Sequence, residues 1–80
     1  MNRDNQVHAA VAAAWSELLG VSRIEATDHF FSLGGDSMLA VLMIERVEEE
    51  LAVTFPLEAL FVDDTFGNTV RQFHTLLNDE

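Results

Sequence analysis

The chain contains no cysteine, no lysine and no tyrosine, and it has a single proline among its 80 residues. Without cysteine it can form neither a disulfide nor a thiolate metal site, which fits a reducing, cytoplasmic location. Its polar start, residues 1–6, lacks the apolar region of a signal peptide, and no apolar run approaches membrane-spanning length. The sequence therefore predicts neither a membrane protein nor a disulfide-stapled secreted domain.

Basic side chains are scarce as well. Four arginines face fourteen acidic residues, for a formal net charge of −10. This balance disfavours nucleic acid and anionic membranes as partners, and it favours basic protein surfaces through electrostatic steering. Part of the acidity only keeps a small domain soluble, but Glu45, Glu48, Glu49 and Glu50 are clustered. We expect this cluster to form a solvated face that adds to a negative field.

What is present indicates one small helical domain. Hydrophobic residues make up 49% of the chain, a share typical of a packed domain rather than a disordered tail. The length allows a single domain over residues 1–80, with its core over about residues 5–77. The predicted fold is all-α, a small bundle of three main helices and one short helix.

Apolar residues recur every three or four positions in the first predicted helix, which begins near Asp4 or Asn5 and ends at Gly20. Its apolar stripe consists of Val7, Ala10, Val11, Ala14, Trp15 and Leu18. The second helix is predicted over residues 37–51. Its core face consists of Leu39, Ala40, Met43, Ile44, Val47 and Leu51.

Three apolar residues of the second predicted helix lie off its core face. They are Met38, Val41 and Leu42, on the flank that also carries Glu45 and Glu49. Single exposed apolar residues are common, but three on one flank indicate a contact surface. We interpret this flank, with Glu45 at its rim, as a surface on which partner proteins dock.

The second half of the chain predicts two further helices. Residues 52–55 are expected to be extended because Pro56 follows them, and a short helix over residues 57–61 comes next. Thr65 is the predicted N-cap of the last helix. The apolar stripe of that helix consists of Phe66, Val70, Phe73 and Leu77. We expect Trp15 and the phenylalanines to form the core.

Residues 21–35 form a long connection between the first two predicted helices. A connection of this length in a compact domain is usually functional. Its expected anchors in the core are Ile24, Phe30, Phe31 and Leu33. Asp28 is expected to cap a short helical turn that follows it over residues 29–31.

The connection ends in the sequence Leu33-Gly34-Gly35-Asp36-Ser37. Two glycines give a backbone that another molecule can approach closely, and Asp36 is a good N-cap. Ser37 would then be exposed in the first helical turn, where a phosphate ester would face free backbone N–H groups. Nothing nearby in the sequence activates the hydroxyl, so we interpret Ser37 as a residue that another protein modifies.

Other readings of this serine fit less well. No lysine follows the glycines, which excludes a nucleotide-binding P-loop. A serine hydrolase needs Gly-x-Ser-x-Gly, whereas Met38 and Leu39 follow this serine. The histidines are scattered singly and are expected at the surface or its boundary, and they are His8, His29 and His74. The pair at positions 63–64 lacks the ligand spacing of an EF-hand, so no metal site is predicted.

The wider stretch from Asp28 to Ser37 (DHFFSLGGDS) resembles the core motif of carrier proteins. These are the thiolation domains of nonribosomal peptide synthetases and their acyl carrier relatives. The resemblance continues through Phe55-Pro56-Leu57 and on to residues 64–66 at the family spacing, and it covers about residues 7–77. It implies an acyl-carrier-like helical bundle.

The resemblance also implies a function. Ser37 would receive 4′-phosphopantetheine from coenzyme A through a phosphodiester, and a phosphopantetheinyl transferase would supply the magnesium and the catalytic groups. Gly34, Gly35 and Asp36 would be the context of this motif. The chain would then be a non-catalytic carrier of acyl or aminoacyl thioesters. Its further partners would be an adenylation or other acyl-loading enzyme and condensation or tailoring enzymes.

The residues leave the branch of the family open. The paired glycines, Phe30-Phe31 and Phe55-Pro56-Leu57 favour a peptidyl carrier, whereas Asp36 and the acidity favour an acyl carrier of polyketide or fatty acid type. An unmodified helical protein-interaction module is the alternative from another class. Because Met1 opens the chain and the chain stops soon after the last helix, we expect a free-standing carrier, with a domain excised from a megasynthase as the alternative. We also expect a monomer.

Overall fold

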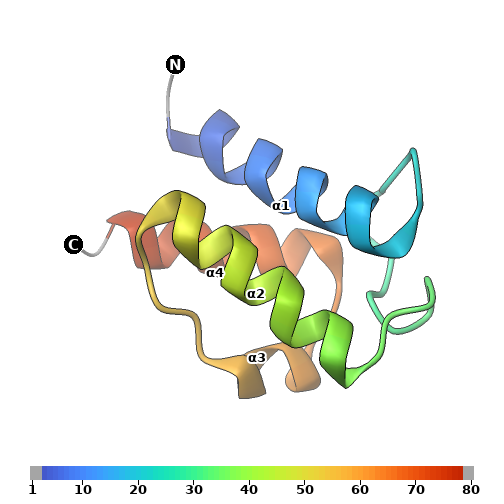
Figure 1. The fold of residues 1–80 in the computed structure, drawn as a ribbon. Coiled ribbons are helices and arrows are strands. Elements are labelled where there is room, and N and C mark those ends of the chain that lie inside the picture. The colour runs from blue at the N-terminus through green and yellow to red at the C-terminus, as the bar shows by residue number, and fades with distance from the viewer. Residues whose placement is uncertain (1–2, 79–80) are drawn as a thin grey trace.

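The computed structural model describes residues 3–78 as a bundle of four α-helices, with no strand within that range. The helices are α1 (Arg3–Leu19), α2 (Ser37–Leu51), α3 (Leu57–Val62) and α4 (Phe66–Asn78). In Figure 1, α1, α2 and α4 form the body of the bundle and α3 lies below α2. α1 contacts both α2 and α4, and the short α3 contacts α2. The predicted arrangement of three main helices and one short helix is confirmed. None of the described helices is long and apolar enough to cross a membrane.

Local signals set the ends of the first two helices. Gly20 ends α1 with a φ of +70°, and its N–H donates to the Ser16 carbonyl at 3.0 Å. α2 ends at Leu51, and its C-cap Ala52 is left-handed with a φ of 58°. The prediction that residues 52–55 are all extended is therefore wrong for Ala52. The N–H groups of Ala52 and Val53 both donate to the Glu48 carbonyl, at 2.7 and 3.3 Å, and this closure of the helix end requires the left-handed turn.

Glu48 also differs from the expected solvated acidic face. It is half-buried, and its Oε2 accepts a hydrogen bond from the Phe55 N–H at 2.6 Å. The side chain thus ties the end of α2 to the segment that leads into α3. Glu45, Glu49 and Glu50 are exposed as predicted.

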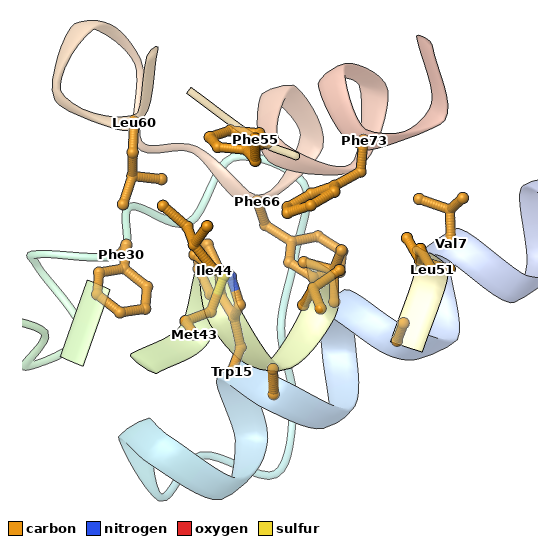
Figure 2. Close-up of a cluster of buried hydrophobic side chains, with 14 of the residues drawn as sticks. Val7, Trp15, Phe30, Met43, Ile44, Leu51, Phe55, Leu60, Phe66 and Phe73 are labelled. Atoms are coloured by element: carbon orange, nitrogen blue, oxygen red, sulfur yellow. The ribbon is translucent and has the colours of Figure 1, made fainter. Parts of the chain in front are cut away.

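Aromatic side chains fill the centre of the bundle (Figure 2). Trp15 is fully buried and meets Phe30 and Phe66 edge to face, with ring centroids 5.1 and 5.2 Å apart. Phe55 stacks on Phe73 at 4.4 Å. The buried core consists of Val7, Ala10, Val11, Ala14, Trp15, Phe30, Ala40, Met43, Ile44, Val47, Leu51, Val53, Phe55, Leu60, Phe66 and Phe73. Burial of these side chains is the main favourable contribution to folding.

The core prediction is wrong for one phenylalanine. Phe61 is 53% exposed, whereas its neighbour Leu60 is completely buried. α3 has six residues, so only one face of it can reach the core, and the next position points about 100° away. Phe31 is intermediate: it packs against the edge of the core and stacks on Phe61 with centroids 5.5 Å apart.

The long connection is anchored largely as predicted. Phe30 is fully buried, and Ile24, Phe31 and Leu33 are partly buried against the core. Asp28, however, does not cap the turn that follows it. Its carboxylate accepts from the Glu25 N–H at 2.9 Å and so closes the preceding turn.

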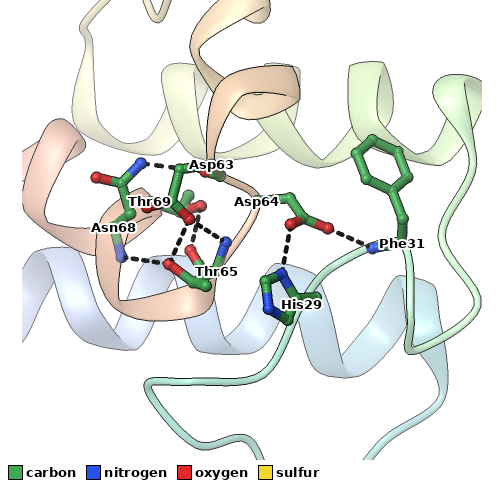
Figure 3. A network of polar contacts seen from close by, with 7 residues as sticks. All are labelled: His29, Phe31, Asp63, Asp64, Thr65, Asn68 and Thr69. Atoms are coloured by element: carbon green, nitrogen blue, oxygen red, sulfur yellow. Dashed lines mark hydrogen bonds and ion pairs between the residues drawn. The ribbon is translucent and has the colours of Figure 1, made fainter.

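Polar groups organise the junction between α3 and α4 (Figure 3). Thr65 caps α4 as predicted, because its Oγ1 accepts from the Asn68 N–H at 3.3 Å. The Asp63 carboxylate holds Thr65 in turn, accepting from its N–H at 3.0 Å and from its Oγ1–H at 2.8 Å. Asn68 and Thr69 are buried but satisfied, since Asn68 donates to the Asp63 carbonyl at 3.1 Å and Thr69 to the Thr65 carbonyl at 2.9 Å.

Candidate functional site

Ser37 is exposed and is the first residue of α2. Asp36 is the N-cap, with a φ of −135°, and its Oδ1 accepts from the Leu39 N–H at 2.9 Å. Its carbonyl accepts the first helical bond, from Ala40, at 2.9 Å. In the described part of the chain, the N–H groups of Ser37 and Met38 donate no hydrogen bond. The hydroxyl therefore sits beside free backbone donors at the positive end of a helix.

The two glycines before Asp36 have different structural roles. Gly34 has a φ of +107°, a conformation that residues with a side chain rarely adopt. Gly35 lies flat against Phe30: a Cβ there would be 2.4 Å from Cε2 of the ring and 2.8 Å from the Phe30 carbonyl oxygen. At Gly35 the close approach is made by the chain's own core aromatic, and the approach of a partner molecule to the two glycines stays a prediction.

Replacing Gly35 by alanine should lower the free energy of unfolding by about 1–3 kcal/mol, because the new methyl overlaps a buried ring and a carbonyl. Gly20→Ala is the matched control: it introduces a left-handed alanine into open space and should cost about 1–2 kcal/mol. Because Phe30 packs on Trp15, only Gly35→Ala should also change tryptophan fluorescence of the folded state. Urea unfolding followed by fluorescence measures both. An unchanged native spectrum for Gly35→Ala would contradict the packing described here.

The flank interpreted as a docking surface is exposed. Met38, Val41 and Leu42 are 73%, 36% and 44% exposed, and Glu45 beside them is exposed as well. The next residue, Met43, is fully buried, so the predicted phase of the helix is confirmed. That partners bind this flank stays a prediction.

Sequence reasoning missed two further exposed apolar side chains. Phe61 and Val62 of α3 are 53% and 87% exposed. Six residues are too few for a periodicity argument. The usable signal was that a helix this short is apolar on nearly all sides, so some of its apolar side chains must face solvent.

His29 lies in the connection that leads to the site. Its Nδ1–H donates to Oδ1 of Asp64 at 2.7 Å, and this hydrogen bond raises the pKa of His29. Partial burial raises the pKa of Asp64, but the bonds from the Phe31 N–H and from His29 outweigh it, and the pKa is lowered. The pKa of Asp63 is also lowered, by the two bonds from Thr65. These groups form a structural cluster that the sequence alone did not show.

The raised pKa of His29 makes a pH dependence of stability predictable. Its contribution is complete below the unfolded-state value of 6.5 and is lost as the pH rises through the folded-state pKa. The melting temperature of the native chain, relative to His29→Gln, should therefore fall as the pH rises from 6.5. Taking the difference removes the pH effects that both proteins share. Parallel curves for the two proteins would show that the pair does not form in solution.

A four-helix bundle with an exposed serine at the capped start of its second helix, directly after a glycine-containing turn, has the architecture of a carrier domain. The model of the family described as "Phosphopantetheine attachment site" matches residues 9–73, and the chain belongs to this family. Gramicidin S synthase 2 of Brevibacillus brevis is 44% identical over 57 residues, which is 71% of this chain. The chain spans only about 1% of the length of that relative.

Solved structures agree. A type-II acyl-carrier-protein from Streptomyces verticillus involved in bleomycin biosynthesis, BlmI, superposes with a TM-score of 0.82 at 28% identity, covering 94% of this chain and 90% of that chain. A structure of the phosphopantetheine transferase Sfp with coenzyme A and a peptidyl carrier protein superposes with a TM-score of 0.75 at 29% identity, covering 100% of this chain and 95% of that chain. With its relatives among peptide synthetases, the chain is a carrier of the peptidyl type, and its cofactor is 4′-phosphopantetheine.

The start of α2 fits this cofactor. The Ser37 oxygen is exposed, and no described side chain hydrogen-bonds to it, which leaves it open to a group brought by another molecule. The free N–H groups of Ser37 and Met38 suit the negative charge of a phosphodiester. The Asp36 carboxylate is held by Leu39.

Proposed function

We propose that Ser37 carries the 4′-phosphopantetheine and that the chain holds aminoacyl or peptidyl groups on it while they pass between biosynthetic enzymes. The observation that carries this proposal is the exposed Ser37 hydroxyl at the capped, positive end of α2, inside the part that matches the attachment family. When bound, the group supplies a thiol on a flexible arm, to which acyl groups attach as thioesters.

The contribution of the protein is presentation. Asp36 begins the helix immediately before Ser37, so the hydroxyl protrudes while the backbone around it is fixed. The first-turn N–H groups stabilise the charge of the phosphodiester once the Ser37 oxygen has bonded to phosphorus. The new bond from the Ser37 oxygen to phosphorus replaces the diphosphate bond of coenzyme A, so adenosine 3′,5′-bisphosphate leaves and the proton of the hydroxyl passes to a base of the transferase. The chain itself needs no catalytic residue for this.

The transferase is the partner we assign to the docking surface formed by Met38, Val41 and Leu42, with Glu45 at its rim. The three apolar side chains begin one residue after Ser37, so an enzyme that reaches the hydroxyl also reaches them. The acidic rim and the net charge of −10 call for basic residues around an apolar centre on the enzyme. A small surface of this kind allows recognition with rapid release.

Adenylating enzymes that load the thiol, and condensation or tailoring enzymes that unload it, are the further proposed partners. The support is the similarity to peptide synthetases, in which the matched segment is a small part of the chain.

Intact-protein mass spectrometry after incubation with coenzyme A, magnesium and a broadly specific transferase tests the proposal. The protein should gain one phosphopantetheine, and adenylating enzymes should then load an amino acid onto it. A chain that stays unmodified although a known carrier is converted in the same tube would favour the unmodified interaction module. Loading by acyl-activating enzymes only would favour the acyl branch.

A further inference from the structure

Asp64 binds three successive residues of the long connection, and Figure 3 shows its contacts with two of them, His29 and Phe31. Its Oδ1 accepts from His29 Nδ1 at 2.7 Å, its Oδ2 from the Phe31 N–H at 2.9 Å, and its carbonyl from the Phe30 N–H at 2.9 Å. Only 15% of the Asp64 side chain is exposed. Asp64, which lies just before the N-cap of α4, thus holds a segment more than thirty residues earlier in the sequence.

The same three residues also close the turn that leads to Ser37. Their carbonyl oxygens accept from the far side of the turn: His29 from Leu33 at 3.1 Å, Phe31 from Gly34 at 3.3 Å, and Phe30 from Gly35 at 3.1 Å. Gly35 stands two residues before Ser37. A continuous set of hydrogen bonds therefore runs from Asp64 through residues 29–31 to the glycines in front of the serine.

We infer that Asp64 is a positioning residue for Ser37: its carboxylate clamps the start of the turn over residues 30–35 and so fixes how the serine is presented. This rests on the proposal that Ser37 is the attachment residue. We call these three bonds the Asp64 clamp. Because it fixes Phe31, the clamp also holds the Phe31 ring on Phe61, which joins the loop to α3.

Main-chain bonds from Phe66 to the Asp28 carbonyl and from Gly67 to the Ala26 carbonyl hold the start of the connection, so the contribution specific to the Asp64 carboxylate lies further along, at Phe31. Residues 21–35 contain no helix, and of their side chains only Phe30 is fully buried. Ser32 and Gly34 are exposed, and a Cβ at Gly34 would meet nothing within 4 Å. Without the carboxylate, Phe31 would lose the partner of its N–H, and only the bond from the Phe30 N–H to the Asp64 carbonyl would still tie the turn to residue 64.

The charges around Asp64 favour the hydrogen bonds of the clamp. Both oxygens of Asp64 accept bonds, which favours the ionised carboxylate, and these bonds lower its pKa. His29 also experiences the negative charges of Asp28 and Asp63, which favour its protonated form, and Arg71 acts on Asp63. The clamp should therefore hold most firmly at mildly acid to neutral pH.

The decisive comparison is Asp64→Ala with Asp63→Ala in the transferase assay. The two carboxylates are adjacent, but Asp63 holds Thr65 at the start of α4 and makes no hydrogen bond to the turn. For Asp64→Ala we expect a fall in kcat of about tenfold or more, since a misplacement of about 1 Å can cost a reaction ~100-fold. For Asp63→Ala we expect a lower melting temperature but a kcat close to that of the native chain. Equal losses of kcat in both variants, or none in Asp64→Ala, would overturn the inference.

Asp64→Asn is the conservative rescue. Its amide oxygen can still accept from Phe31 and its NH₂ can donate to neutral His29, so kcat should recover to near the native value while the pH dependence due to His29 is lost. A kcat for Asp64→Asn as low as that of Asp64→Ala would show that the hydrogen bond to Phe31 is not what positions the serine.

A second readout does not depend on the transferase or on the folding of the alanine variant. In the native chain, the backbone amide resonances of Gly34 and Gly35 should shift with the titration midpoint of Asp64, and Asp64→Asn should abolish that component. If the Gly34 and Gly35 resonances do not shift at this midpoint, the inference that the Asp64 carboxylate holds the turn is wrong. A Ser37→Ala chain that still gains phosphopantetheine would instead refute the attachment residue and leave this titration as an independent test of the clamp.

Discussion

Ser37→Ala should leave the protein folded and abolish the gain of phosphopantetheine completely. The serine is exposed, and no described residue hydrogen-bonds to its hydroxyl, so only the acceptor oxygen is lost. Surface substitutions of this kind usually change the free energy of unfolding by no more than about 0.5 kcal/mol. Intact mass after incubation with coenzyme A and a transferase measures the modification, and thermal unfolding confirms the fold.

Ser32→Ala is the matched control for this result. Ser32 is an exposed serine in the turn that leads to α2, five residues before Ser37. It precedes the glycines and does not lie at a helix start. It should gain the group at the native rate. If Ser37→Ala still gained one phosphopantetheine while folded, or if Ser32→Ala lost the ability, the assignment of the attachment residue would be wrong.

The second large effect is a contrast between two neighbouring residues of α2. Met43→Asp should unfold the domain, because Met43 is fully buried and an unpaired charge there costs several kcal/mol. A core of this size rarely supplies more than about 3–5 kcal/mol of net stability. Leu42→Asp, one position earlier and 44% exposed, should barely change the melting temperature.

The same Leu42 variant should slow the transferase. Removing an apolar contact from the docking surface should raise KM about tenfold, the change that corresponds to about 1.4 kcal/mol of binding. Leu42→Asn removes the contact without adding charge beside Glu45, so it should slow the reaction to a similar extent. Melting curves and transfer rates measured on the same samples decide between roles. A collapsed melting temperature for Leu42→Asp would place the side chain in the core, and unchanged rates would place the docking surface elsewhere.

The sequence by itself determined the elements whose signals are local. The bounds of α2 at Ser37 and Leu51 follow from the cap residue Asp36 and from apolar periodicity over fifteen residues. Thr65 as an N-cap and Gly20 as a helix end could be predicted for the same reason. In each case the interacting groups lie within about four residues of one another, so a pattern in the sequence contains both partners.

Only the tertiary structure decided which acidic side chains order the loops. Asp28 and Asp64 are both aspartates next to turns, yet Asp28 bonds back to Glu25, and Asp64 reaches Phe31 from 33 residues away. Glu48 reads as a surface charge, but it bonds to Phe55 seven residues later, across the end of a helix. The bond between Asp28 and Glu25 is local, but no local pattern records the partners of Asp64 and Glu48, because these groups come together only when the chain folds back on itself.

The exposed side of α3 was likewise decided by packing. Leu60 and Phe61 are adjacent and similarly apolar, and six residues give no period from which to choose between them. The contact of α3 with α2 turns Leu60 into the core and leaves Phe61 to stack on Phe31 at the surface. The sequence therefore determined where the serine lies and how its helix begins. The contacts that hold the turn before that serine were decided by the tertiary structure, because the hydrogen bonds from Asp64 and the packing of the helices join segments that are distant in the chain.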